Sequence, residues 1–400
     1  MSKARPPQVS CLLPSPKGYV LADDPMCHFP MRLTRTQAGQ PSDPFLTYGE
    51  YFSAIREVIS RDAYGPLVDA TARQLAEDVS LTDMDEIRIY AEKHGSDYRP
   101  ARIEVAVHDV WASFAMNVAV AATGKDRLCR EFDILQLLNS KYSHRFLPQT
   151  YFRGEALYGS GPGENNMLMF LADWFKGYHE FHLSIDENHG LQKLVVWDAV
   201  KGHQCLSPSQ ARQAHRQAAK TMTLYYDIET FEQIFPWHHG AGDFVVKTQD
   251  KSLDLRLVTA RQYAPMLGRF QGVSVHEALL FFLLNLSVRM RLDRLDGVGA
   301  VAWADDDCVE ATVGGFMEGL WTKEQQGIIN GDFADGFLRF CRSLDKNDLF
   351  DGCHALIDAC DPSAPDMPVI RGRLESHVRK LHTVLHEFRL GEFSPRKHGK

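Results

Sequence analysis

The sequence predicts an α+β protein in two parts, a small strand-rich part followed by a larger and mostly helical part. Between residues 84 and 172, apolar and polar residues alternate in short runs, and a period of two is typical of strands with one buried face. Beyond residue 207, apolar residues recur mostly at spacings of three and four, which indicates amphipathic helices. With 400 residues, of which 44% are hydrophobic, the chain is long enough for two packed lobes.

Composition and charge exclude several functional classes. The net charge of −8 disfavours non-specific binding to nucleic acid, because there is no excess of Lys and Arg to displace counterions. The longest apolar run, residues 278–286, is too short to span a bilayer, and the N-terminus does not have the pattern of a signal peptide. Eight scattered cysteines without a C-x-x-C pair indicate reduced thiols. We therefore expect a cytoplasmic protein that binds neither nucleic acid nor membrane.

The first 83 residues are predicted to be extensions of the main fold. Residues 1–44 contain eight of the nineteen prolines and little periodic hydrophobicity, which predicts an extended arm. Residues 45–83 are predicted to form a helical hairpin, because Tyr51, Phe52 and Ile55 begin an apolar series at helical spacing. A Gly-Pro pair then interrupts the series.

The remaining elements follow in chain order. Residues 84–172 are predicted to form a small antiparallel sheet with one helix, and residues 173–400 a helical part that contains one two-stranded hairpin. The predicted strands are 87–91, 103–107, 114–121, 149–153, 167–171, 244–246 and 253–258. The predicted helices are 126–139, 207–235, 274–293, 306–320, 332–343, 346–360 and 368–388.

Three motifs occur in an order that resembles a known family. Arg130-Glu-Phe-Asp-Ile-Leu-Gln-Leu-Leu138 precedes Phe146-Leu-Pro-Gln-Thr-Tyr-Phe-Arg-Gly154, then come Met167-Leu-Met-Phe-Leu-Ala-Asp-Trp-Phe-Lys-Gly177 and the loop around His238. Over residues 84–390 the chain resembles the protein-kinase-like fold, specifically its aminoglycoside- and choline-phosphotransferase branch. The resemblance implies a two-lobed fold with a small antiparallel-sheet N-lobe (84–172) and a larger, mostly helical C-lobe (173–400). It also implies that ATP and Mg²⁺ bind between the lobes.

The resemblance assigns roles to residues of the N-lobe. Glu131 matches the helix glutamate that orients a phosphate-binding strand lysine, but Asn117 occupies the position of that lysine. Lys125 lies just past the strand and either reaches back as a substitute or is a solvated turn lysine. Met169, Leu171 and Asp173 fall in the segment that joins the lobes beside the adenine. The phosphate loop of the family corresponds to residues 92–97, which contain a single glycine.

The catalytic loop of the family reads H-G-D-x-x-x-x-N. When its asparagine is laid on Asp243, its aspartate falls on His238. A histidine titrates near neutrality and is able to accept a proton, and an aspartate is a hard oxygen ligand for Mg²⁺. The second metal-binding aspartate of the family corresponds to Thr259. Asp250 and Asp254 lie earlier in the hairpin and are either turn and solvated-face residues or candidates for the second metal ligand, for which we choose Asp254.

Three functions remain open. The first is a pseudokinase, a regulatory module that binds a nucleotide or related small molecule without turnover. The second is an active, divergent phosphotransferase that acts on a small hydroxyl acceptor, with His238 as base. The third is a metal-dependent hydrolase that uses His238, His239 and Asp243 as ligands, joined by His179, Glu180 and His182 of the segment Gly177-Tyr-His-Glu-Phe-His182.

Overall fold

The computed structural model describes residues 6–31, 46–92, 98–159, 165–186, 189–198, 201–237, 242–266 and 272–389. The chain divides into two compact units. The first unit comprises Met1–Lys141 and Pro148–Lys176, and the second comprises Tyr142–Leu147 and Gly177–Lys400. The protein is therefore an α+β protein with two units, as predicted, and the later boundary falls at Lys176, where the sequence had suggested residue 172.

The first unit is built on a seven-stranded mixed sheet with the order β2-β1-β3-β4-β5-β7-β6. Strand β1 runs parallel to β3, and every other pair in this sheet is antiparallel. Residues 8–21 of the proline-rich arm thus belong to the sheet. Each strand that was predicted between residues 84 and 172 is confirmed. The bounds are β1 (Gln8–Ser15), β2 (Gly18–Leu21), β3 (Met84–Ala91), β4 (Ala101–Val107), β5 (Val110–Ala119), β6 (Thr150–Tyr158) and β7 (Asn165–Asp173).

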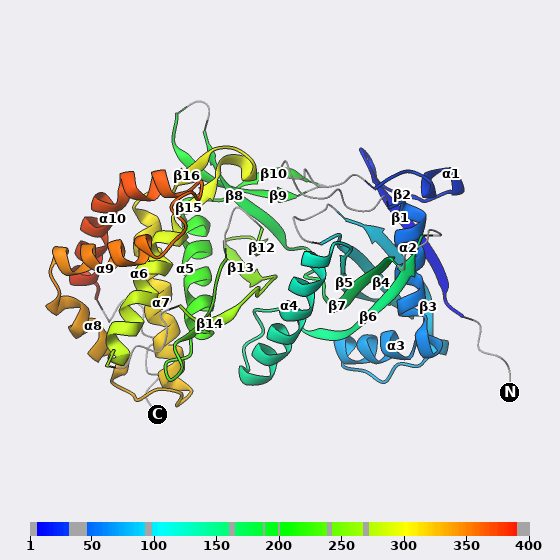
Figure 1. Ribbon diagram of the computed structural model, residues 1–400, viewed down its shortest axis with the longest axis horizontal. Helices are drawn as coiled ribbons and strands as arrows, with labels where there is room; N and C mark the ends of the chain where they lie inside the picture. Colours follow the sequence, from blue (N-terminus) through cyan, green and yellow to red (C-terminus); the bar gives the residue numbers. More distant parts are fainter. Residues whose placement is uncertain are drawn as a thin grey trace. The chain divides into compact units, whose positions relative to one another are not determined.

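Helices cover both faces of this sheet (Figure 1). On one face, α2 (Tyr48–Ile59) and α3 (Arg61–Leu75) pack on the alternate strand residues that form the core. On the other face, α4 (Ala122–Lys141) places Phe132 against Phe170 of β7, with 5.6 Å between ring centroids. Two short elements complete the described part of this unit, α1 (Asp24–Cys27) and the 3-10 helix Leu81–Asp83.

The second unit contains a five-stranded sheet with the order β10-β9-β8-β12-β13. Only the hairpin β12–β13 was predicted, so the expectation of a helical lobe with one hairpin was wrong for residues 179–205. Two short antiparallel pairs, β11–β14 and β15–β16, accompany this sheet. The bounds are β8 (His179–Ile185), β9 (Gln192–Asp198), β10 (Gly202–Cys205), β11 (Glu232–Ile234), β12 (Phe244–Gln249), β13 (Ser252–Leu257), β14 (Tyr263–Pro265), β15 (Leu292–Arg294) and β16 (Val301–Trp303).

The helices of the second unit pack most closely where α5 meets α7. A Cβ atom at Gly315 would overlap the Arg216 carbonyl oxygen, and one at Gly319 would lie 2.6 Å from Thr223 Cβ. These glycines let the two helix backbones approach each other directly. The bounds are α5 (Pro208–Leu224), α6 (Val275–Met290), the 3-10 helix Leu295–Gly297, α7 (Asp307–Gln325), α8 (Phe333–Ser343), α9 (Lys346–Asp358) and α10 (Met367–Glu387).

Helix α5 ends at Leu224, whereas the sequence predicted a helix through residue 235. The physical reason is a turn at Asp227, whose carboxylate accepts hydrogen bonds from the backbone N–H groups of Glu229 and Thr230. Such local side-chain bonds compete with helical ones. The early end of the helix leaves residues free to form β11.

Candidate functional site

The described residues on either side of the loop before β12 are closely packed. His238 and His239 lie outside the described residues. On one side of them, Trp237 is buried and packs edge-on against Phe244, with 5.6 Å between ring centroids. On the other side, Gly242 has φ +72°, and a Cβ there would lie 2.7 Å from Glu180 Oε1. The left-handed backbone and the close carboxylate both favour glycine at this position.

Asp243 is buried and is bound through both carboxylate oxygens by one arginine. Arg261 Nη1 lies 2.7 Å from Asp243 Oδ2, and Arg261 Nη2 lies 2.5 Å from Oδ1. The carboxylate is 1% exposed and the arginine 34%. In addition, the Asp243 carbonyl oxygen accepts a hydrogen bond from the Val258 N–H. A guanidinium in this bidentate geometry neutralises the carboxylate, so a metal ion would have to compete with Arg261.

Asp254, the other predicted metal ligand, belongs to a separate ion pair on β13. Arg256 Nη1 lies 3.0 Å from Asp254 Oδ1, and the Tyr178 hydroxyl donates to Asp254 Oδ2. In the β12–β13 ladder, Asp254 is three residues from Leu257, which pairs with Phe244 next to Asp243. At about 3.4 Å per residue, the two aspartates are roughly 10 Å apart along the hairpin. The structure thus does not bring them to one metal position.

Asn117 lies half-buried on β5, on the sheet face that α4 partly covers. It pairs with Phe170 of β7, which contacts that helix. The same face carries Arg102 of β4, which pairs with Ala115, two residues before Asn117. A cation therefore exists on the Asn117 face, one strand away.

Arg102 is already surrounded by partners in the first unit. Its Nε lies 2.9 Å from Glu92 Oε1, and its Nη1 also bonds to Glu104. The guanidinium carbon lies 3.8 Å from the centroid of the Tyr90 ring. Sequence reasoning missed Arg102, although the alternation around Ile103 places Arg102 and Glu104 on the face opposite the core. With two carboxylates beside it, this arginine contributes no net positive charge for a phosphate.

Glu131 is buried on α4 and accepts a hydrogen bond from the Tyr98 hydroxyl at 2.6 Å. The bond ties the helix to the segment that leads into β4. Lys125, in the first turn of the same helix, donates to Asn166 Oδ1 at 2.5 Å. Asn166 is four residues along β7 from the partner of Asn117, or about 13 Å. Lys125 thus points to another part of the sheet and does not replace the missing strand lysine.

The three residues predicted to contact the adenine stabilise the first unit instead. The side chains of Met169 and Leu171 are fully buried in the core beneath α2 and α3, and both residues are paired with β5 and β6. Asp173 accepts hydrogen bonds from the Gln74 amide, the Gln149 N–H and the Tyr151 hydroxyl. Strand β7 continues through these residues, so their side chains and backbone take part in the sheet and its core.

The histidines of β8 do not converge on one ligand. Because neighbouring residues of a strand face opposite sides, His179 and His182, three positions apart, project to opposite faces. His179 Nε2 lies 3.6 Å from Asp198 Oδ2, whereas His182 Nδ1 lies 3.4 Å from Asp293 Oδ1. Within the described ranges, no cluster of three or more histidine, cysteine, aspartate or glutamate side chains is arranged to hold a metal ion.

His182 instead forms a buried charged cluster. Burial by itself lowers the pKa of His182. The hydrogen bonds and negative charges of Asp293 and Glu180 outweigh this effect and raise the pKa from 6.5 to about 9. Asp293 also accepts hydrogen bonds from the backbone N–H groups of Leu183 and Arg294. A Cβ at Gly297 would lie 2.9 Å from the imidazole, so the ring is closely enclosed. Asp293 is far from His182 in sequence, and no local motif indicates this pair.

No family model matches the sequence, and no curated protein matches it.

Among the residues that the structure describes, no helix combines the length and apolar character needed to cross a bilayer.

Proposed function

We propose that this protein is a kinase-like nucleotide-binding module that does not transfer phosphate. The single observation that supports the absence of phosphate transfer is the ion pair between Arg261 and the buried Asp243. The resemblance to the phosphotransferases places Asp243 at the metal-binding position of the catalytic loop. Phosphoryl transfer depends on metal ions and positioned cations that neutralise the developing charge. A carboxylate that is already neutralised by arginine binds Mg²⁺ poorly.

The order of the strands in the first unit supports the kinase-like part of the proposal. Five antiparallel strands follow one another in the spatial order β3-β4-β5-β7-β6, and α4 is inserted between β5 and β6. The resemblance expects an antiparallel sheet with one helix that carries a glutamate, and Glu131 is buried on that helix. A nucleotide would approach the sheet face of Asn117, because the opposite face is filled by α2 and α3.

Three further residues agree with binding without turnover. Asn117 is able to hydrogen-bond but cannot neutralise phosphate charge, and Lys125 is engaged at Asn166. Thr259 occupies the position of the second metal-binding aspartate. We therefore assign nucleotide binding mainly to hydrogen bonds, with little contribution from Mg²⁺.

Thermal unfolding with ATP or ADP, each with and without Mg²⁺, tests this proposal. A ligand that binds only the folded state at a hundred times its Kd stabilises it by about 2.7 kcal/mol. We expect both nucleotides to raise Tm by similar amounts, with little further rise on adding Mg²⁺. No change of Tm with either nucleotide would overturn nucleotide binding. Release of ADP from ATP in the presence of Mg²⁺ would overturn the absence of transfer.

A matched pair of variants locates the binding face. Asn117→Lys places the missing cation at the position expected for the phosphates, and we expect it to tighten ATP binding. Asn165→Lys adds the same charge at an exposed position near the other end of β7 and should leave binding unchanged. Equal effects of the two variants would show that Asn117 does not face the nucleotide.

A further inference from the structure

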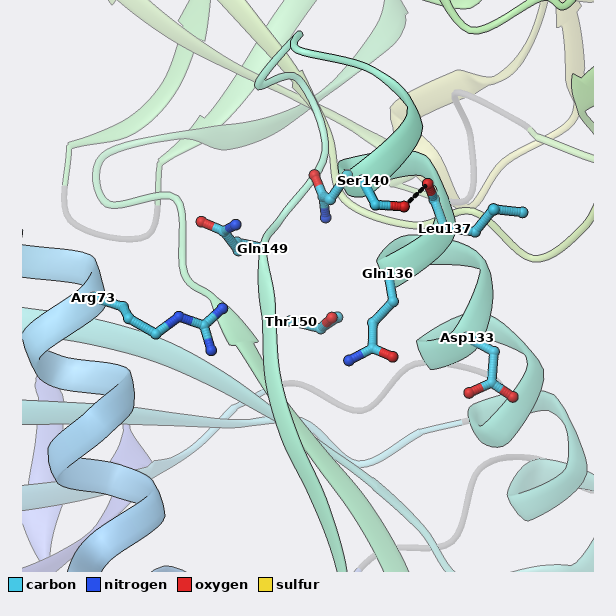
Figure 2. A pocket seen from close by; sticks show the side chains of 8 residues that line it. Arg73, Asp133, Gln136, Leu137, Ser140, Gln149 and Thr150 are labelled. Atoms are coloured by element: carbon cyan, nitrogen blue, oxygen red, sulfur yellow. Dashed lines mark hydrogen bonds between the residues drawn. The ribbon is translucent and has the colours of Figure 1, made fainter.

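A cavity of about 590 Å³ lies in the first unit between α3, α4 and the start of β6. Figure 2 shows Thr150 at its centre, with the Arg73 guanidinium approaching from α3 and the Gln136 amide from α4. Gln149 lies beside Thr150 on the same strand segment, and Asp133 is at the far edge. The lining includes neither Asn117 nor any other residue of β5.

The lining offers both hydrogen-bond donors and acceptors. Arg73 contributes guanidinium N–H groups, and its guanidinium carbon lies 4.9 Å from the centroid of the Tyr151 ring. The Gln136 and Gln149 amides each have a donor and an acceptor, and the Thr150 hydroxyl has both functions. Asn139 donates to the Pro148 carbonyl at 2.9 Å, which leaves its amide oxygen as an acceptor.

The charges of the lining do not favour an ion. Arg73 contributes one positive charge and Asp133 one negative charge, so the two formal charges cancel. Asp133 Oδ1 also lies 3.5 Å from Arg153 Nη1, but both side chains are exposed, so this weak pair does not remove the charge of Asp133. Leu137 is the single apolar side chain in the lining, so a purely apolar molecule would leave most polar groups without partners. A neutral ligand with many groups that both donate and accept hydrogen bonds fits this lining best.

We propose that this cavity binds a small polyhydroxylated molecule, a sugar or polyol. Each hydroxyl of such a molecule donates and accepts, as the two glutamine amides and the threonine hydroxyl do. The ligand would bridge α3 and α4 across Thr150. Because the cavity is open and its polar residues are mostly exposed, binding is expected to be weak, in the millimolar range. This inference does not depend on nucleotide binding.

Ligand-observed saturation-transfer NMR tests the proposal with D-glucose, D-ribose and myo-inositol as probes. Sugars and polyols raise the Tm of most proteins by exclusion from their surfaces, so contact must be measured in place of stability. The test variants are Gln136→Ala, Gln149→Ala and Thr150→Val, which remove hydrogen-bonding groups. Gln326→Ala is the matched control, because it removes an exposed glutamine of the second unit. Far-UV circular dichroism checks that each variant is folded.

We expect at least one probe to bind, and each test variant to weaken that binding by about three- to tenfold, the usual effect of one lost hydrogen bond. The control should bind as the original chain does. Absence of saturation transfer for all three probes would overturn the proposal, as would equal weakening by Gln326→Ala. Inorganic phosphate that binds in place of the sugars would show an anion site and would also overturn it. Nucleotide-induced changes of Tm should be the same in the three test variants, so the two proposals fail separately.

Discussion

Arg261 binds both carboxylate oxygens of Asp243, at 2.7 and 2.5 Å, and so holds a buried aspartate as half of an ion pair. The pair joins the residue before β12 to the segment after β13. The hairpin is thereby closed at its base, where the Val258 N–H also donates to the Asp243 carbonyl oxygen. The aspartate that resembles a metal ligand therefore has a structural partner.

Removing the arginine is expected to destabilise the protein. Arg261→Ala leaves the Asp243 carboxylate buried without its countercharge, which typically costs about 3 kcal/mol or more. Because Arg261 is a third exposed, we expect the lower end of this range. Urea denaturation measures the change. Adding Asp243→Asn should recover part of the loss, and a double variant no more stable than Arg261→Ala would argue against a charge effect.

Stability is expected to fall at alkaline pH because of His182. Its folded pKa of about 9 is above its ordinary value of 6.5, so the folded state holds a proton that the unfolded state releases. The resulting stabilisation is complete below pH 6.5 and disappears as the pH rises through 9. It amounts to on the order of 3 kcal/mol.

Urea unfolding between pH 6 and 10 checks this expectation. His182→Asn should flatten the alkaline decline, whereas His189→Asn, which changes an exposed histidine, should leave it intact. An unchanged decline in His182→Asn would mean that other groups cause it.

Two buried histidines are expected to make the stability of the protein fall as the pH decreases below 6.5. Burial, together with the nearby Arg291 charge, lowers the pKa of His377 to about 3, and burial lowers that of His215 to about 4. Below pH 6.5 the unfolded chain binds protons that the folded chain excludes, so stability falls as the pH decreases. For His215 alone the loss is on the order of 3 kcal/mol. His377→Gln should make this acidic decline shallower, and an identical acid-unfolding curve would contradict the assignment.

The contact between α5 and α7 predicts contrasting effects of two adjacent substitutions. Gly315→Ala places a methyl group on the Arg216 backbone, and such overpacking should cost about 3 kcal/mol. Gly314→Ala meets nothing within 4 Å and should stabilise α7 by up to about 1 kcal/mol through helix propensity. Thermal unfolding of the two variants gives the comparison. Similar effects at both positions would show that the helices do not meet closely at Gly315.

The spacing of apolar residues in the sequence predicts the strands and helices that bury one face at regular intervals. The strands from Ile87 to Leu171 were predicted because apolar residues alternate, and their core positions are occupied by the residues expected. Strand β8 was missed because its residues include His179, Glu180 and His182, whose polarity resembles a loop. The end of α5 was misplaced because the Asp227 turn depends on side-chain bonds that hydrophobic spacing does not reveal.

The candidate site was predicted less well than the fold, because its residues were chosen by local motif and their partners are distant in sequence. Asp243 was identified, but Arg261, which changes its chemistry, carries no local signal. Glu131 was identified, and its partner Tyr98 was not. Met169 and Leu171 were expected to face a ligand, although the same alternation that predicted their strand places them on the core side.

Strand β1 also has a consequence for how the chain is made. It pairs in parallel with β3, which is synthesised much later. On the ribosome, residues 8–15 must remain without this sheet partner until α2, α3 and then β3 have emerged. Long-range pairing of this kind slows folding. Once seated, β1 and β2 cover an edge of β3 that would otherwise be open to pairing with other chains. A shortened chain that begins at Thr47 would present that edge, so we expect the amino-terminal strands to protect the newly made protein from aggregation.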